Sequence, residues 1–108
     1  MNKHFTLGDG EAMNAAHPNT FWIPTREERE DLMIGMSAKL MLEQPAPTAS
    51  RKPALWNINS ERMWVTVTEK VPGGYVGKLD NTPVVVKAKH GQVVRFEARH
   101  VIGIHPAM

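Results

Sequence analysis

The sequence predicts a mainly β, α+β fold, namely a small curled antiparallel barrel of the SH3-like type with one short N-terminal helix. Three observations predict this class. Residues 61–104 hold several short β-rich segments at close spacing, a long connection precedes them, and a single turn breaks the final strand. Gly77 lies inside one of these segments, where glycine commonly marks strong curvature. An open, helix-covered α+β sheet remains the alternative architecture.

A chain of 108 residues, 42% of them apolar, is long enough for one globular core. We therefore expect a single domain over residues 21–108. Residues 1–20 are expected to form a disordered N-terminal tail, because they mix Gly, Asn and His with a lone Phe5. This segment lacks the basic start and apolar run of a secretory signal. Nothing in the chain approaches the roughly 18 apolar residues of a membrane span, so no membrane partner is expected.

A capped helix is expected at the start of the domain. Thr25 and Glu28 have the spacing of a capping box, in which each side chain satisfies a backbone amide at the helix start. Gly35 suits the left-handed conformation that closes a helix. The sequence therefore predicts a helix over residues 26–34, and residues 21–23 before it are expected to fold back onto the domain.

The first strand is expected over residues 36–44, where the residues alternate between two faces. Leu40 and Leu42 share the face that is predicted to meet the core. Residues 45–60 then form a long loop that contains three prolines. A connection of this length inside a small domain is commonly functional or partly disordered. Trp56 within it favours the functional interpretation.

The clearest β pattern covers residues 63–68, which are rich in β-branched and aromatic types with a period of two. Trp64 falls on the face opposite to the core residues, where the helix or the segment before it is expected to cover it. The turn-forming residues 72–74 return the chain over residues 75–79, so the two segments predict a hairpin. The remaining expected elements are short strands at 84–86 and 93–97, one helical turn at 98–100, and a final strand at 101–104.

The runs at residues 61–68, 74–83, 90–96 and 100–104, taken in this order, resemble a group of small bacterial domains of unknown function. Some members of that group are called immunity-protein-like because they occur near polymorphic toxins. The resemblance covers roughly residues 18–104 and implies the fold more than the activity, because fold alone does not carry function. It implies a bacterial protein whose partner is a toxin or a host factor.

The sequence departs from that group at two places. His90-Gly91-Gln92 stands where an aromatic residue, Gly and Asp are expected, and Gly35-Met36 stands where Gly-Asp is expected. Both departures fall in predicted turns, so they alter turn surfaces more than the core.

Residues with catalytic or metal-binding chemistry form no recognisable pattern. The chain has no cysteine, which excludes a thiolate nucleophile, a disulfide and the cysteine-based zinc frameworks. None of the three serines lies in a Gly-x-Ser-x-Gly motif. Asp80 is the acid best suited to a chemical role, and its alternative is to accept backbone amides in its own turn. His100 and His105 fall on opposite faces of a strand. We therefore expect no enzyme activity, no cofactor and no metal.

A binding role is the remaining interpretation, and a protein partner is favoured. Trp, Tyr and Arg are enriched at the energetic centres of protein interfaces. We expect Arg51, Trp56, Trp64 and Tyr75 to contact the partner. The oligomeric state stays open. The expected location is the cytoplasm.

Nucleic acid is the alternative partner. Residues 44–108 hold nine Lys and Arg against four Asp and Glu, whereas residues 1–43 hold four against seven. Small barrels bind single strands by combining aromatic platforms with cations. The same basic bias is also typical of an ordinary solvated surface.

Overall fold

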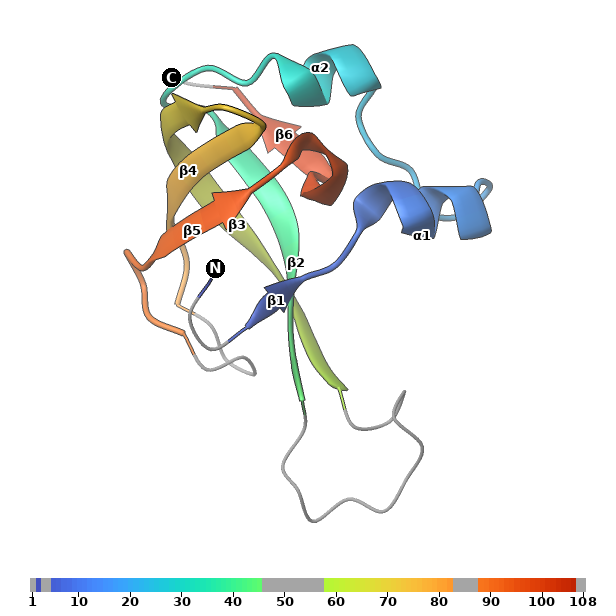
Figure 1. Cartoon of the computed structure of the whole chain (residues 1–108). Helices are drawn as coiled ribbons and strands as arrows, with labels where there is room; N and C mark the ends of the chain where they lie inside the picture. Colours follow the sequence, from blue (N-terminus) through green and yellow to red (C-terminus); the bar gives the residue numbers. More distant parts are fainter. Residues whose placement is uncertain (1, 3–4, 46–57, 83–87, 107–108) are drawn as a thin grey trace.

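The computed structural model describes residues 2, 5–45, 58–82 and 88–106. Over these ranges the chain begins with a short strand and two short helices, and the sheet strands follow (Figure 1). The elements are β1 (Thr6–Leu7), α1 (Gly10–Ala16), α2 (Arg26–Glu30), β2 (Ser37–Pro45), β3 (Ile58–Val71), β4 (Gly74–Leu79), β5 (Val93–Phe96), the 3-10 helix η2 (Ala98–His100) and β6 (Gly103–His105). None of the helices in these ranges has the length and apolar character needed to cross a membrane.

The strands form one curled antiparallel sheet in the order β1-β2-β3-β4-β5, and β6 pairs with β2 as well (Figure 1). β2 pairs with β3 along the whole length of β2, from Ser37 opposite Thr66 to Pro45 opposite Ile58. β1 and β6 therefore share the other edge of β2, with β6 at Ser37–Lys39 and β1 at Leu42 and Glu43. This mainly β architecture confirms the small curled α+β barrel that the sequence predicts.

β2 and β3 form a hairpin that is longer than the sequence indicates. Their pairing continues to Pro45 and Ile58, so the strands project beyond the rest of the sheet in Figure 1. The predicted loop over residues 45–60 is correspondingly shorter. Arg51 and Trp56 lie outside the described residues, and so does the strand expected at residues 84–86.

Strong curvature at β4 depends on Gly77. A Cβ atom at this position would lie 2.5 Å from the carbonyl oxygen of Thr66, so only glycine allows β3 and β4 to approach this closely. The register between the two strands also shifts between Val67 and Glu69, which marks a β-bulge. Both features bend the sheet, as the glycine inside the strand indicated.

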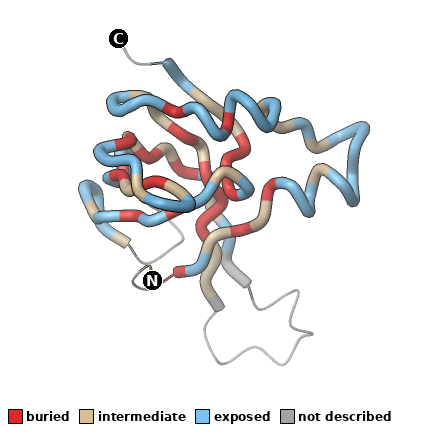
Figure 2. Tube along the Cα trace, turned by 45° about the horizontal axis from the view of Figure 1, so that its top comes forward, coloured by how far each residue is buried: buried red, intermediate tan, exposed pale blue. Residues whose placement is uncertain are grey.

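The core fills the concave side of the sheet. Leu40 and Leu42 are fully buried, as predicted, and alternate residues of β3 join them. In Figure 2 the buried residues gather along the strands at the middle of the molecule, while the connections are mostly exposed. The buried apolar cluster consists of Phe5, Leu32, Ala38, Leu40, Leu42, Met63, Val65, Val67, Tyr75, Leu79, Val94, Phe96 and Val101.

Residues 5–20 are folded, so the prediction of a disordered tail over residues 1–20 is wrong for this part of the chain. Phe5 is only 5% exposed and belongs to the core. β1 then pairs with β2, and Asp9 caps α1 by accepting a hydrogen bond from the backbone amide of Ala12 at 3.0 Å. The domain therefore carries α1 in addition to the one helix that was expected. A single buried aromatic residue and a cap are signals that composition does not reveal.

α2 begins as predicted and ends earlier. Thr25 and Glu28 form the expected capping box. The helix stops at Glu30 because the backbone amide of Leu32 donates to the Tyr75 hydroxyl, at 3.2 Å, in place of a carbonyl one helical turn back. Gly35 takes the left-handed conformation, with φ at 95°, but it lies in a turn beyond the end of the helix, so the prediction that it closes the helix is wrong.

Candidate binding surface

Three side chains on β2 and β3 point away from the core and lie side by side. The register places Lys39 opposite Trp64. Arg62 lies two residues before Trp64 on the same strand, so it takes the same face. The intervening Met63 faces the core. The convex side of the hairpin therefore presents one aromatic ring between two cations.

Trp64 is half-buried and is fixed by its neighbours. The Lys39 ammonium lies 5.4 Å from the centre of the indole ring. From β6, the His105 ring meets the indole edge to face, with 6.1 Å between ring centres. The backbone amide of Trp64 donates to the Asn81 side chain at 3.0 Å, and its carbonyl accepts from the amide of Asp80 at 2.9 Å. The Asn81 side chain thus ties the turn after β4 to the backbone of β3.

The segment between α1 and α2 extends this surface. The Asn14 side chain donates to the carbonyl of Phe21 at 2.7 Å and so ties the segment to α1. The Arg62 guanidinium lies over the Phe21 ring, 5.5 Å from its centre. The neighbouring Trp22 is 78% exposed. The expectation that residues 21–23 fold back onto the domain is thus confirmed for Phe21, whereas the Trp22 side chain stands in solvent.

We call this surface the aromatic–cationic face. It consists of Phe21, Trp22, Lys39, Arg62, Trp64 and His105. A depression of about 200 Å³ lies within it, lined by Thr20, Phe21, Trp22, Lys39, Arg62 and Ile102.

Lys39 and Arg62, the two permanent cations of the aromatic–cationic face, have no ion-pair partner among the described residues. The ion pairs formed among the described residues lie elsewhere, on the helices and around η2. Neither Lys39 nor Arg62 takes part in any of these ion pairs. Both cations instead lie over aromatic rings, Lys39 over Trp64 and Arg62 over Phe21. The face therefore attracts anionic groups.

Tyr75, which we expected to contact a partner, belongs to the core. It is 4% exposed, and its ring stacks on Phe96 with 5.2 Å between centres. Its hydroxyl donates to the carbonyl of Arg29 at 2.8 Å and accepts from the amide of Leu32. Both the apolar ring and the polar tip are satisfied inside the molecule, so the expectation is wrong. Tyr75 instead fastens the end of α2 to the sheet.

Of the four residues predicted to bind a partner, the structure thus places Trp64 at the surface and Tyr75 in the core, while Arg51 and Trp56 lie outside the described ranges. Trp22 and Lys39 also lie on this surface, although neither was among the predicted contacts. Alternation already put Lys39 on the outward face of its strand. The sequence did not reveal the register between β2 and β3, which places Lys39 beside Trp64.

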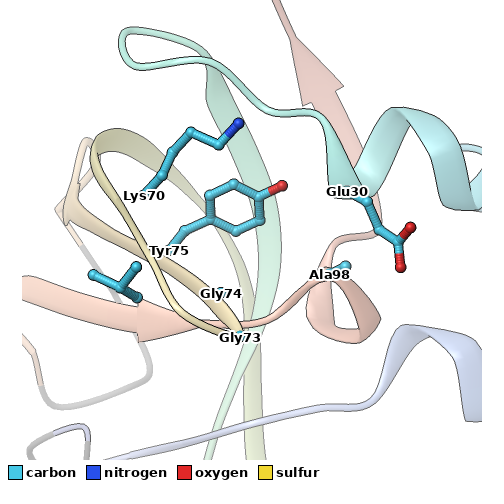
Figure 3. Close-up of a pocket in the computed structure, with 7 residues that line it drawn as sticks. Glu30, Lys70, Gly73, Gly74, Tyr75 and Ala98 are labelled. Carbon is cyan, nitrogen blue, oxygen red and sulfur yellow. The ribbon is translucent and has the colours of Figure 1, made fainter.

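A second depression, of about 310 Å³, lies beside the β3–β4 turn (Figure 3). Lys70 and Glu30 stand on opposite sides of it, with the Tyr75 ring between them. A Cβ atom at Gly74 would collide with the carbonyl oxygen of Phe96, so the turn needs a bare backbone there.

Arg29 is a buried cation that joins three parts of the chain. It is 5% exposed and pairs with Glu11 of α1 at 2.6 Å. Its guanidinium also donates to the carbonyls of Pro24 and Ala98, each at 3.0 Å. These partners lie on α1, before α2 and on η2, so Arg29 holds the helical layer together.

His100 is also a buried titratable group. It is 7% exposed, and its Nδ1 atom accepts a hydrogen bond from the amide of Glu97 at 2.9 Å. Burial, reinforced by the neighbouring Arg99 charge, lowers the pKa of His100. The imidazole is therefore neutral, with its proton on Nε2. Across the part of the chain that the structure describes, no three His, Asp or Glu side chains gather where they could hold a metal ion.

No family model, no curated protein and no solved structure matches this chain. The resemblance to immunity-protein-like domains therefore stays a prediction.

Proposed function

We propose that the protein is a small, non-catalytic binding module that docks a protein partner on its aromatic–cationic face. The observation that carries this proposal is the position of Trp22, which is 78% exposed beside Lys39 and Arg62. An exposed tryptophan next to arginine is typical of the energetic centre of an interface. Trp64 supplies the rigid aromatic neighbour.

The partner class in this proposal comes from the resemblance found in the sequence. A toxin or a host factor that the module inhibits is the favoured partner, and the cytoplasm of a bacterial cell is the favoured location. Arg51 and Trp56 remain predicted contacts, because the loop that carries them joins β2 to β3, the two strands that build the face.

Nucleic acid is the second candidate partner, because cations and aromatic rings alternate on the face. A protein is favoured over it for one physical reason. Tracking a phosphate backbone requires a row of cations, and each one contributes to the salt dependence of binding. Among the described residues, only Lys39 and Arg62 supply permanent positive charge to the face.

The test is affinity capture from native cells after photo-crosslinking, with the wild type and Trp22→Ala. Ile34→Ala is the matched control, since Ile34 is also a well-exposed apolar residue, on the turn after α2. We expect a crosslinked protein that is lost with Trp22→Ala and retained with Ile34→Ala, while both variants keep the wild-type melting temperature. Capture that is equal for both variants would contradict the proposal. Loss of the captured material on nuclease treatment would support the nucleic-acid candidate instead.

A further inference from the structure

We infer that the partner presents an acidic segment, one carboxylate of which binds between Lys39 and Arg62 while an adjacent apolar side chain packs on Trp22. This inference rests on the proposed function, because it names the chemistry of the partner at the same face.

The geometry of the two cations supports the inference. Lys39 and Arg62 come from adjacent strands and line the same depression of about 200 Å³. Trp22 lines the depression as well. Small-molecule pockets typically enclose about 300–1,000 Å³. A depression of this size suits one side chain of a longer segment better than a complete small ligand.

The rings beneath the cations prepare them for binding. The Lys39 ammonium lies over Trp64, and the Arg62 guanidinium lies over Phe21. A side chain that already rests on a ring loses less conformational freedom when a carboxylate arrives. The Arg62 guanidinium has a planar fork of donors that matches a carboxylate, and no described residue forms an ion pair with it.

Charge complementarity indicates that the segment of the partner is negatively charged. The described acidic residues that form ion pairs bind Arg26, Arg29 and Arg99, and none of these pairs involves Lys39 or Arg62. A basic segment would meet two like charges on this face, which is unfavourable by several kcal/mol in a close contact. A neutral segment would leave the two charges partly desolvated without a partner. An acidic segment removes both penalties.

A phosphate group would satisfy the same two cations, so the apolar part of the face is what favours a peptide. Trp22 offers a large exposed indole beside the depression. An aliphatic or aromatic side chain next to the carboxylate buries this apolar surface, which favours binding in proportion to the apolar area removed from water. A segment that alternates acidic and apolar residues matches both features.

The experiment is an NMR titration of the full ¹⁵N-labelled chain with three capped synthetic heptapeptides. The first is Ser-Glu-Leu-Glu-Leu-Glu-Ser, and the other two replace every Glu by Gln or by Lys. We expect the Glu peptide to shift the indole N–H of Trp22 and the amides of Lys39 and Arg62. Its affinity should exceed that of the Gln peptide at least about tenfold and fall as salt is added, and the Lys peptide should not bind.

Charge-removing variants locate the binding site. The double variant Lys39→Gln/Arg62→Gln should bind the Glu peptide no better than the Gln peptide. Lys70→Gln is the matched control, because Lys70 lies beside the other depression and should not affect binding. Both variants should keep the wild-type melting temperature, since they change exposed or half-buried side chains.

Three outcomes would overturn the inference. If the Gln peptide binds the face as tightly as the Glu peptide, the acidic segment is excluded while docking on the face stands. If none of the peptides shifts the face, the inference fails, whereas the proposed function is still decided by capture with Trp22→Ala. If an eight-residue oligothymidylate binds the same residues more tightly than the Glu peptide, the anion is a phosphate and the partner is nucleic acid.

Discussion

The aromatic residues inside and outside the barrel differ in the groups that surround their side chains. Tyr75 and Phe96 stack on the concave side and close the core, whereas Trp22 and Trp64 lie on or beside the convex side of the β2–β3 hairpin. In the inner pair, the Tyr75 hydroxyl forms hydrogen bonds with the backbone of Arg29 in α2 and of Leu32 just after it. The outer pair is surrounded by cations that have no carboxylate partner among the described residues.

Residue type alone therefore does not distinguish an interface residue from a core residue. Tyr75 and Trp64 both come from the β3–β4 hairpin and both have the composition of an interface residue. Two factors decide their roles. Each side chain points to the face of the sheet that its position in the strand dictates, and the Tyr75 hydroxyl finds backbone partners inside the molecule. Substitutions on the inner side should therefore change stability, and substitutions on the outer side should change binding.

The largest expected effect is that of Tyr75→Ala. Removing a buried aromatic ring from a packed core typically costs about 3–5 kcal/mol. The variant should therefore unfold at a much lower temperature or denaturant concentration than the wild type, as followed by circular dichroism. Tyr75→Phe removes only the hydroxyl and should cost about 1–3 kcal/mol, because Leu32 and Arg29 then lose a partner. A melting temperature that Tyr75→Ala leaves unchanged would contradict the core assignment.

A smaller loss is expected from Gly77→Ala. The added Cβ atom meets the backbone of Thr66, which cannot move without disturbing the strand pairing. Overpacking of this kind typically costs about 1–3 kcal/mol. Lys78→Ala is the control on the same strand, and because Lys78 is exposed it should change stability by no more than about 0.5 kcal/mol. Equal urea denaturation midpoints for the two variants would show that β3 and β4 do not need glycine at this position.

His100 makes stability depend on pH. Its pKa in the folded protein is lower than in the unfolded chain, so the unfolded chain binds the proton more readily. The neutral His100 contributes fully to the stability of the folded protein only above the pKa of histidine in the unfolded chain, which is about 6.5. It is lost as pH falls through the lower, folded value. Between pH 8 and pH 5 the wild type should lose more thermal stability than His100→Gln, and identical losses would refute the role of His100.

The smallest effect on stability is expected on the outer side. Trp22→Ala removes a side chain that is mostly in solvent, so the free energy of unfolding should change by no more than about 0.5 kcal/mol. Chemical denaturation is the measurement. A loss comparable to that of Tyr75→Phe would mean that Trp22 supports the fold and is not free to bind.

Local signals in the sequence predicted much of the fold. The parity of β2 and β3, the capping box at Thr25 and the helical turn at η2 depend on neighbours within a few residues. The bend at Gly77 was visible because a glycine inside a strand is itself a local signal, although the atom it makes room for belongs to the paired strand. Such features follow from short-range sterics and hydrogen bonding.

The errors concern contacts between distant parts of the chain. The fold of residues 5–20 depends on where Phe5 is buried and which strand receives β1. The burial of Tyr75 depends on α2 ending above it. The aromatic–cationic face depends on the segment between α1 and α2, which places the Phe21 ring against Arg62 of β3. The alternation of apolar and polar residues predicts none of these contacts, because strand register and packing depend on the whole domain.

The measurement that tests the division between the two sides most directly is calorimetric titration of the crosslinked partner, once identified, against Trp22→Ala and Tyr75→Phe. We predict that Trp22→Ala raises the Kd at least about tenfold at an unchanged melting temperature, as expected for an interface centre. Tyr75→Phe should lower the melting temperature and leave the Kd of the folded protein unchanged. If Tyr75→Phe weakens binding as much as Trp22→Ala does, or if Trp22→Ala leaves the Kd unchanged, the aromatic–cationic face is not the binding surface.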